Sequence, residues 1–571
     1  MSHPPKPASP GQLSLEQRAL DWARAESETF DVVVIGGGIT GVGAALDARS
    51  RGLSVLLVEA TDIAAGTSSK SSKLIHGGLR YLEMLDFSLV REALGERKLL
   101  LQQIAPHLVK PVPFIWPLTH RLWERGYLGA GLALYDSMGG AGAVPMHRHL
   151  GKRRMQQIAP GLDPAAYVGG VHFHDAIEDD ARYAMMVART AAALGAAVLT
   201  QASALAIEAE RGSAHAVLVR NNLTGSEVRV RTRSVVVAAG PWTEQVLALA
   251  GQHQSTVAVR PSKGIHIVVP GDRIQSQAGV LMRTEKSVLF VIPWQGQWLI
   301  GDTDTEWTQQ QGPPVATSTD IDYLLAKVNT ILRRHLTRDD IVGIFAGLRP
   351  LVQTDPTAST TKLSREHSVS SPAPGVYVIA GGKFTTYRVM AKDLVDAVVQ
   401  GSDLSASPSK TADIALVGAL GYHRLVDQAD ELARSTGVSE PAVRRLLDRY
   451  GSLAAELLQL IRQDPALGHP LPGAAPYLAV EATYAFLREG ALSIADVLER
   501  RTRIRIQVAD SGAACARQVA ALGAAVLGWS QREQTRQVQA YRRSLAAERA
   551  AHAEPTDAQA VAAYHEHLAA T

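Results

Sequence analysis

The stretch FDVVVIGGGITGVGAALDARSRGLSVLLVEA, residues 30–60, constrains the fold more than any other part of the chain. An apolar run meets a cluster of three glycines, a series of small residues follows, and a second apolar run ends at Glu59. Short, continuous apolar runs indicate strands that are buried on both faces, as in a parallel sheet. The stretch therefore predicts a strand–helix–strand unit with a right-handed connection.

This unit carries the spacing GxGxxG at Gly36, Gly38 and Gly41. In a dinucleotide-binding unit the first glycine permits a tight turn, the second lets the backbone approach a pyrophosphate, and the third lets the helix pack on the strand. The free N–H groups at the helix start then bind the phosphates. Glu59 lies where a carboxylate would accept hydrogen bonds from an adenosine ribose. We therefore expect a dinucleotide cofactor.

A polar loop with the sequence GTSSKSSKLIHGG, residues 66–78, follows the second strand at once. A domain that binds NAD would usually continue its sheet without such an interruption. Hydroxyls, amides and glycine suit an extended cofactor whose far ring lies deep in the protein, and glycine permits close backbone approach. An ordinary polar surface loop is the alternative interpretation. We expect FAD rather than NAD.

The apolar run VYVIAGG, residues 376–382, leads into Lys383 and then into Thr385 and Thr386, which open a helix. A helix start at the end of a sheet strand favours negative charge. We expect this second anion site to face the flavin ring, and a turn without a ligand is the alternative.

The overall composition limits the classes of function. The formal net charge is +3, with 46% hydrophobic and 20% charged residues, so this is a globular chain whose charge does not suit coating of nucleic acid.

The chain also carries few groups for redox or metal chemistry. Cys515 is the only cysteine, which excludes an intrachain disulfide and an iron–sulfur cluster. We predict no metal site. No apolar run reaches the ~18 residues that a membrane span needs, and the N-terminus does not look like a secretory signal.

The predicted fold class is α/β, because the sheet is revisited by two later apolar strands at 234–242 and 375–388. We expect a Rossmann-like FAD-binding domain interleaved with an α+β substrate domain, followed by an all-α C-terminal domain. The expected boundaries are a flexible N-terminal arm at 1–29, FAD-binding segments at about 30–100, 181–254 and 351–400, substrate-domain segments at about 101–180 and 255–350, a linker at 401–412, and helices at 413–571. Within the arm, residues 13–29 can form a short amphipathic helix, which we expect to dock on its own domain; a partner-binding helix is the alternative.

Several cations stand in apolar or glycine-rich surroundings, and together they suggest a clamp for a phosphate or a carboxylate. They are Arg80, Arg349, Arg365 and Lys383. Ordinary solvated arginines are the alternative. His266 alternates with apolar residues, so it is either a core histidine or the base that takes a hydroxyl proton while a hydride leaves for the flavin. For His76 we favour a role in holding the flavin.

Taken together, these motifs resemble the FAD-dependent glycerol-3-phosphate dehydrogenases, within the wider group of D-amino-acid-oxidase-like flavoproteins. The resemblance covers residues 30–400 and is carried by GGGITGVGAALDARSRGLSVLLVEA, GTSSKSSKLIHGGLRYLE, IPW, GDTDTEW, AGLRPL, LSREH and GGKFTTYR. The C-terminal segments LLDRYGS and LERRTRIRI resemble the helical domain of that family less specifically.

The resemblance implies oxidation of sn-glycerol 3-phosphate to dihydroxyacetone phosphate, with electrons passed through FAD to a quinone. It implies catalytic roles for His266 and Arg349. The substrate residues that it implies are Arg80, Tyr81, Arg349, Arg365 and Lys383. The cofactor residues that it implies are Gly36, Gly38, Gly41, Glu59, Thr67, Ser68, Ser69, Lys73, His76, Gly77, Ala239, Gly240, Gly382, Lys383 and Thr385.

Three alternative functions stay open. They are a glycerol-3-phosphate oxidase that uses O2, an amino-acid or hydroxy-acid oxidase of the same fold, and a non-catalytic flavin-binding scaffold. Because quinone is lipid-soluble, we expect a cytoplasmic protein that can attach to the cytoplasmic face of the inner membrane. The aromatic stretch 114–135 and the basic stretch 147–154 would form the membrane patch, and a solvated helical cap is the alternative. Whether the chain forms a homo-oligomer is left open.

One residue departs from the resemblance. The motif GDTD carries Asp302 where we would expect a small hydroxyl residue such as threonine. We expect the added carboxylate to point to solvent, and the substitution Asp302→Thr to leave turnover unchanged.

Overall fold

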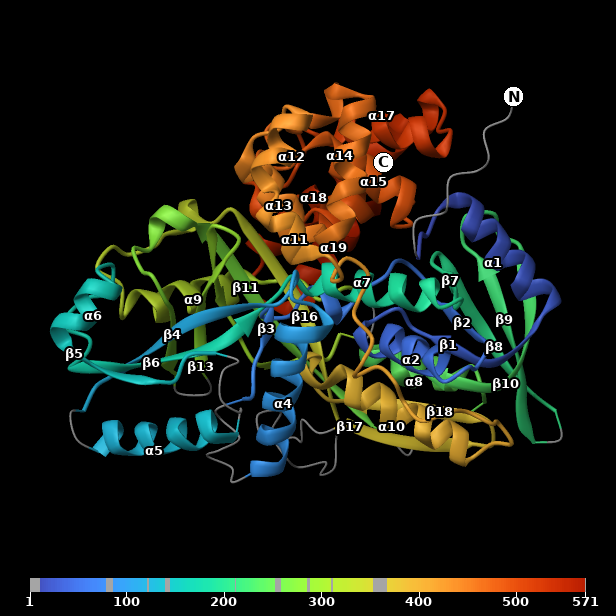
Figure 1. Cartoon of the computed structure of the whole chain (residues 1–571), viewed down its shortest axis with the longest axis horizontal. Coiled ribbons are helices and arrows are strands. Elements are labelled where there is room, and N and C mark those ends of the chain that lie inside the picture. Colours follow the sequence, from blue (N-terminus) through green and yellow to red (C-terminus); the bar gives the residue numbers. More distant parts are fainter. Residues whose placement is uncertain are drawn as a thin grey trace.

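The computed structural model in Figure 1 contains two β-sheets and a helical part that packs above them. It describes residues 11–78, 86–120, 123–138, 144–210, 212–251, 258–284, 288–309, 312–352 and 367–569. Three residues that the sequence assigns to the substrate lie outside the described residues, and these are Arg80, Tyr81 and Arg365.

The first sheet contains the predicted strand–helix–strand unit. Its order is β17-β18-β10-β1-β2-β7, with β9 paired to both β10 and β8. The strands are β1 (Thr29–Ile35), β2 (Val55–Val58), β7 (Ala197–Leu199), β8 (Ala202–Glu210), β9 (Ser213–Asn221), β10 (Glu227–Val237), β17 (His367–Ala373) and β18 (Val376–Gly381). The run from β18 through β10, β1 and β2 to β7 is parallel throughout. The parallel sheet predicted from the apolar runs is confirmed.

Helices cover this sheet. Helix α2 (Ile39–Ser50) joins β1 to β2 and packs against α7 (Asp180–Ala193) and α10 (Tyr387–Gln400). A short helix, α8 (Thr243–Ala248), follows β10. Because α2 consists mostly of small residues, its neighbours can approach closely, and a Cβ added at Gly43 would lie 2.9 Å from the ring of Tyr387.

The N-terminal segment contains the helix expected at 13–29, so the flexible arm expected at 1–29 is drawn too long. Helix α1 (Leu15–Ser27) packs against β7 and β10, as expected for a helix that docks on its own domain. Asp21 is buried, and its carboxylate accepts a hydrogen bond from the Val198 N–H at 3.1 Å. A helix that satisfies a backbone donor of the sheet is tied to the fold rather than free of it.

The second sheet is mostly antiparallel, with the order β15-β11-β14-β13-β12-β4-β6-β3, and with β16 on β11 and β5 on β6. The strands are β3 (Leu74–Ile75), β4 (Lys110–Leu118), β5 (Arg148–Gly151), β6 (Gly169–Ile177), β11 (Val259–Pro270), β12 (Gly279–Arg283), β13 (Val288–Trp294), β14 (Gln297–Gly301), β15 (Thr305–Glu306) and β16 (Gly343–Val352). The helices beside it are α4 (Phe87–Leu99), α5 (Trp123–Met138), α6 (Lys152–Ile158) and α9 (Ser318–Asn329).

The register of strand β11 positions several polar side chains together. The antiparallel pairing with β16 places His266 opposite Phe345 and Ser262 opposite Arg349. The pairing with β14 places Gly301 opposite His266. Because side chains alternate between the faces of a strand, Ser262 and His266 point to the same face.

The C-terminal part is helical, as predicted. From residue 413 to residue 569, all of which the structure describes, helices are the only regular elements. The α-helices are α11 (Tyr422–Asp427), α12 (Ala429–Thr436), α13 (Glu440–Tyr450), α14 (Ala454–Gln463), α15 (Ala479–Arg488), α16 (Ile504–Gln507), α17 (Ala516–Leu527), α18 (Gln531–Ala553) and α19 (Asp557–Ala569).

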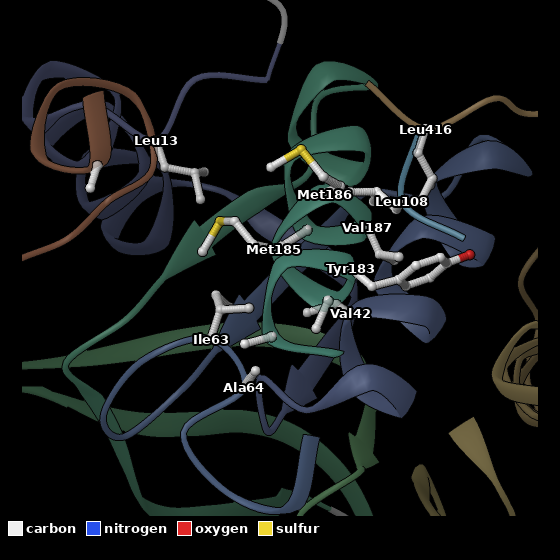
Figure 2. Packing of buried hydrophobic residues seen from close by; sticks show 14 of the residues in the cluster. Leu13, Val42, Ile63, Ala64, Leu108, Tyr183, Met185, Met186, Val187 and Leu416 are labelled. Atoms are coloured by element: carbon white, nitrogen blue, oxygen red, sulfur yellow. The ribbon is translucent and has the colours of Figure 1, made fainter. Parts of the chain in front are cut away.

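Helix α7 connects the parts of the molecule. Figure 2 shows Met185 and Met186 of α7 in a buried cluster with Leu13 of the N-terminal segment, Val42 of α2 and Leu416, which precedes the C-terminal helices. Burial of one such side chain contributes roughly 1.5–3 kcal/mol. This shared core holds the helical part on the first sheet.

Buried ion pairs also tie the C-terminal part to the loops after β2. The carboxylate of Asp62 accepts two hydrogen bonds from Arg501, each at 2.7 Å, and both side chains are buried. Arg503 donates a hydrogen bond to the Ser69 carbonyl oxygen at 2.7 Å. The loop at residues 66–78 is therefore supported from behind by the C-terminal helices.

Candidate active site

The glycine cluster forms a tight turn between β1 and α2. Gly36 has a φ of +117°, which favours glycine, and a Cβ there would lie 2.5 Å from the Ala238 carbonyl oxygen. Gly38 caps α2, so the first N–H groups of this helix are turned towards the end of the sheet. A Cβ at Gly41 would overlap the carbonyl oxygen of Gly36, so the helix can lie this close only with glycine there.

Glu59 lies directly over this turn. Its carboxylate accepts hydrogen bonds from the Gly37 N–H at 2.7 Å and from the Thr61 N–H at 2.8 Å. Burial raises the pKa of Glu59, and these backbone donors counteract part of that effect. A carboxylate at the end of the second strand and next to the helix start has the position of a ribose-binding acid.

A cavity of about 910 Å³ extends from this turn along the end of the first sheet. Its size suits an extended organic cofactor. Its walls come from the four segments in which the sequence predicts cofactor contacts. The predicted residues that line it are Gly36, Gly38, Glu59, Thr67, Ser68, Ala239, Gly240, Gly382 and Lys383.

The polar loop closes over the helix start at one end of this cavity. The Ile39 N–H donates a hydrogen bond to Ser68 Oγ at 2.8 Å, so a hydroxyl from the loop lies at the point where a phosphate oxygen would accept. The glycine turn, the acid, the hydroxyls and the helix start all belong to one continuous cavity, and these residues fit FAD.

A second cavity of about 520 Å³ lies between the loop and the second sheet. The predicted residues that line it are Thr67, His76, His266, Arg349, Lys383 and Thr385. Both cavities are lined by Thr67, Lys70, Ser71, Gly347, Leu348, Lys383 and Phe384. The two cavities therefore meet, and a molecule in the second one can contact a cofactor in the first.

His266 is buried in the wall of the second cavity. Its ring stacks on Phe345 with 4.8 Å between ring centroids and 8° between planes. Its Nε2 lies 3.0 Å from Ser72 Oγ, and Ser72 lines the same cavity. Burial lowers the pKa of His266 to about 4, against the opposing effect of the Asp302 carboxylate. The imidazole is therefore neutral near pH 7.

Arg349 lies among acceptors rather than alone in the cavity. Its Nη2 pairs with the Asp302 carboxylate and donates to the Thr303 carbonyl oxygen at 2.9 Å. Its Nη1 lies 3.4 Å from Ser262 Oγ and 3.8 Å from Asp304 Oδ1. The prediction that Asp302 points to solvent is wrong, because the side chain pairs with Arg349 in the cavity wall.

Lys73 lies behind the cavity wall. Its ammonium forms an ion pair with Asp180 at 2.9 Å, and it lies 4.8 Å from the ring centroid of Phe345. Burial lowers the pKa of Lys73 to about 8. Lys73 lines neither cavity, whereas Lys70, three residues earlier, lines both.

Three other predicted cofactor residues are also absent from the cavity walls, and these are Gly41, Ser69 and Gly77. The Gly77 N–H donates to Tyr135 Oη at 2.8 Å, and the neighbouring Gly78 lines the second cavity instead. The sequence reasoning did not select Lys70 or Ser72, although both lie in the loop that it selected. Asp304 lies in the motif GDTDTEW, which carries part of the resemblance, but no role was predicted for it.

Metal clusters and membrane-spanning helices are both absent from the described part of the chain. No three His, Cys, Asp or Glu side chains gather there in a way that could hold a metal ion. Within the same residues, no helix combines the length and the apolar character needed to cross a bilayer.

Known proteins resemble this chain over nearly its whole length. Residues 31–397 match the family described as FAD dependent oxidoreductase, and residues 409–534 match the C-terminal domain of alpha-glycerophosphate oxidase. Glycerol-3-phosphate dehydrogenase 2 from Mycobacterium tuberculosis is 49% identical over 566 residues, which cover 98% of this chain and 96% of that protein. The mitochondrial glycerol-3-phosphate dehydrogenase of Homo sapiens is 34% identical over 90% of this chain and 73% of its own length.

A solved structure agrees with these relatives. The glycerol-3-phosphate dehydrogenase from Bacillus halodurans, complexed with FAD, matches with a TM-score of 0.75 and 29% identity, over 93% of this chain and 97% of that one. The chain thus belongs to the glycerol-3-phosphate dehydrogenase family of FAD-dependent oxidoreductases, and its cofactor is FAD.

Proposed function

We propose that the protein oxidises sn-glycerol 3-phosphate at C2 to dihydroxyacetone phosphate and passes the electrons to a quinone. The observation that carries this proposal is the meeting of the two cavities, with His266 and Arg349 in the wall of the second one. The names of the relatives supply the substrate. FAD, when bound, supplies the acceptor for the hydride that leaves C2.

In this proposal the first cavity holds the cofactor. The backbone N–H groups at the start of α2 bind its pyrophosphate, and Glu59 accepts hydrogen bonds from its ribose. The start of α10, after Lys383 and Thr385, favours negative charge on its ring. The loop at residues 66–78 separates the two cavities and contributes Thr67 and Ser68 on the cofactor side. Lys73 supports that loop from behind through its ion pair.

The phosphate of the substrate is assigned to Lys383, which lies where the two cavities meet. The family resemblance adds Arg80 and Arg365 as further phosphate ligands and Tyr81 as a substrate contact, and these three lie outside the described residues. A charge-assisted hydrogen bond to a phosphate contributes ~1.5–3 kcal/mol. A carboxylate substrate would use the same cations, so the choice between substrates needs a direct test.

The hydroxyl proton goes to His266. As the C2–H bond breaks and its electron pair leaves with the hydride, the O–H proton moves to the imidazole and the carbonyl forms. A neutral imidazole has a lone pair for this step, which the lowered pKa of His266 preserves near pH 7. Ser72, at 3.0 Å from Nε2, can relay the proton from the cavity.

The wall of the second cavity suits a lipid-soluble acceptor. Phe87, Trp116, Tyr127 and Leu134 line it, and the last two belong to α5. Trp123 and Tyr127 on this helix are 57% and 50% exposed. Amphipathic aromatic side chains at a surface favour the interface of a membrane. We therefore place the quinone and the membrane surface on the side of α5.

Anaerobic mixing tests the function. Addition of sn-glycerol 3-phosphate to the oxidised holoenzyme should bleach the flavin absorbance, whereas glycerol and lactate should not. If the oxidised spectrum persists, the dehydrogenase function fails; if lactate or an amino acid bleaches it, an oxidase of another substrate class is favoured. Peroxide formation compared with quinone-dye reduction then separates O2 from quinone as the acceptor.

A further inference from the structure

The guanidinium of Arg349 is already held by the protein. Both hydrogens of Nη2 have acceptors, because this nitrogen pairs with Asp302 and also donates to the Thr303 carbonyl oxygen at 2.9 Å. Nη1 lies 3.4 Å from Ser262 Oγ. A Cβ at Gly264 would lie 2.9 Å from Arg349 Cζ, so the guanidinium rests against the backbone of β11.

This arrangement conflicts with a role as a phosphate clamp. An arginine binds phosphate best with two parallel N–H groups, which form one edge of the guanidinium. The two edges that can do this are Nη1 with Nη2 and Nε with Nη2, and both need Nη2. Since both hydrogens of Nη2 are used, a phosphate could be gripped in this way only by displacing Asp302 or the Thr303 carbonyl.

The charges around Arg349 also argue against phosphate binding by this residue. Two carboxylates, Asp302 and Asp304, lie beside one guanidinium, and the side chain of Asp304 is only 5% exposed. Ser262 Oγ donates to Asp304, which holds this second carboxylate in place. A phosphate dianion that approached Arg349 would meet a cation whose charge is already compensated.

The same residues lie next to the proposed base. Gly301, the neighbour of Asp302 in the chain, stands opposite His266 in the register of β11 and β14. Ser262, which contacts Arg349, shares a strand face with His266. Arg349, Asp302 and His266 all line the second cavity. Arg349 is therefore placed with the group that handles the hydroxyl.

We propose that Asp302 is a positioning residue that makes Arg349 a single hydrogen-bond donor to the reacting oxygen of the substrate and prevents it from binding the phosphate. This inference rests on the proposed function and refines it. Recognition of the phosphate is left to Lys383 and the other cations assigned to the cavity. A threonine at position 302 would release Nη2 and give the cavity an additional anion-binding arginine.

Titration of the oxidised holoenzyme with inorganic phosphate tests the inference without turnover. Flavin absorbance reports the binding. The variants are Asp302→Asn, which keeps an acceptor for Nη2 without the charge, and Asp302→Thr, which removes the charge and both carboxylate oxygens. We expect Asp302→Thr to bind phosphate at least about tenfold more tightly than the wild type, because Nη2 is released and the charge of Arg349 is less compensated. Asp302→Asn should lie between the two, because only the charge is lost. Asp302→Glu should restore weak binding.

Kinetics with sn-glycerol 3-phosphate give the second readout. Because Asp302 pairs with Arg349 in the cavity wall, the unchanged turnover expected for Asp302→Thr from the sequence no longer applies. We expect kcat of this variant to fall at least about tenfold, because a misplaced donor costs transition-state stabilisation, while KM stays equal or falls. The matched control is Asp322→Thr, which removes a carboxylate from an exposed pair with Arg338 at 2.7 Å and should change neither value.

The outcomes separate this inference from the proposed function. If the wild type is not reduced by sn-glycerol 3-phosphate, the function fails, whatever the phosphate titration shows. If the wild type is reduced but phosphate affinity and kcat of Asp302→Thr equal those of the wild type, the inference is wrong. Should Asp302→Thr lose its flavin, the isosteric Asp302→Asn decides through the phosphate titration, where an affinity equal to that of the wild type contradicts the inference.

Discussion

Lys73 and Asp180 form an ion pair of 2.9 Å in which both side chains are fully buried. Ser71 also donates to Asp180 through its N–H and its hydroxyl, at 2.9 and 2.7 Å. The pair thus fixes the backbone of the loop at residues 66–78 from behind, at Ser71, which lines both cavities. Lys73, which the sequence assigns to the cofactor, therefore lies behind the walls of the two cavities and lines neither.

Removal of one partner of this pair should destabilise the protein strongly. Lys73→Met leaves the buried carboxylate of Asp180 with Arg503, at 3.2 Å, as its remaining cation, so the loss should lie near the lower end, about 3 kcal/mol, of the range for a broken buried pair. We expect a loss of that order in the free energy of unfolding, measured by urea denaturation, together with weaker retention of FAD. The double variant Lys73→Met/Asp180→Asn should recover part of the loss. A change below about 1 kcal/mol in the single variant would contradict a structural role.

His266 should be needed for flavin reduction but not for flavin binding. His266→Gln removes the proposed proton acceptor, and a positioned general base contributes typically 10²–10⁴-fold. We expect the rate of anaerobic flavin reduction at saturating substrate to fall within that range, while FAD content stays equal to that of the wild type. Ser72→Ala should also lower the rate of flavin reduction, but by less than His266→Gln. A rate within threefold of the wild type would remove His266 from the mechanism.

The lowered pKa of His266 also predicts a pH dependence of stability. An imidazole in the unfolded chain titrates near 6.5, whereas burial lowers the pKa of His266 to about 4. Between these values the unfolded chain binds the proton and the native state does not, so stability should fall as the pH decreases from 6.5 to 4. The urea midpoint of the wild type should therefore fall more steeply over this range than that of His266→Gln.

Two other histidines provide controls for the comparison of urea midpoints. Burial lowers the pKa of His107 to about 3, and because His107 is present in both proteins it gives both profiles a common acid slope. His335 is exposed, so His335→Gln should keep the wild-type profile. Parallel curves for the wild type and His266→Gln would show that His266 does not contribute.

Gly36 should be indispensable for binding FAD. Gly36→Ala places a Cβ against the Ala238 carbonyl oxygen in the turn that receives the pyrophosphate, at a φ of +117°. We expect purified protein with less than about a tenth of the wild-type flavin. Gly52 also has a positive φ of +96°, but nothing lies within 4 Å of an added Cβ. Gly52→Ala should keep FAD and lose only the ~1–2 kcal/mol of backbone strain; equal flavin contents would contradict the assignment of the turn.

The exposed cations of α6 should promote binding to anionic membranes. Lys152, Arg153 and Arg154 are consecutive in α6, just before the buried Met155, and all three are exposed. Replacement of the three by glutamine should remove roughly 3 kcal/mol of attraction to an anionic surface, at ≈ 1 kcal/mol per charge. Sedimentation with phosphatidylserine vesicles at low salt measures the effect.

A matched triple variant controls for net charge. Arg517, Arg532 and Arg542 are exposed on α17 and α18 of the C-terminal part, and their replacement by glutamine removes the same charge from another face. This control should sediment like the wild type. If both triple variants lose binding equally, the attraction is a general effect of charge and the patch on α6 is not a membrane site.

Much of the cofactor site could be predicted because its residues follow one another along the chain. Gly36, Gly38 and Glu59 belong to a single strand–helix–strand unit, whose geometry is set by local backbone preferences and by burial on both faces of a parallel sheet. The spacing of these residues therefore specifies their arrangement in space. The same reasoning found the apolar strands at 234–242 and 375–388 and the helical C-terminal part.

The order of polar residues in the loop at residues 66–78 did not indicate which of its two lysines faces the cavities. Lys70 and Lys73 stand three residues apart, and Lys73 has a φ of +59°, in the left-handed region that few residues other than glycine adopt. That conformation turns its side chain towards Asp180. The local sequence does not predict this left-handed conformation of Lys73, because it is stabilised by the carboxylate of Asp180, more than a hundred positions later.

The sequence by itself determined the class of fold, the cofactor and the family, because these depend on short motifs whose geometry is local. The tertiary structure alone decided the partners of the side chains that we propose to be catalytic. His266 meets Ser72 across 194 positions, and Arg349 meets Asp302 across 47, through the register of β11 with its neighbouring strands. Register depends on which faces of distant strands are buried together, and this is why Asp302, expected in solvent, lies against Arg349 instead.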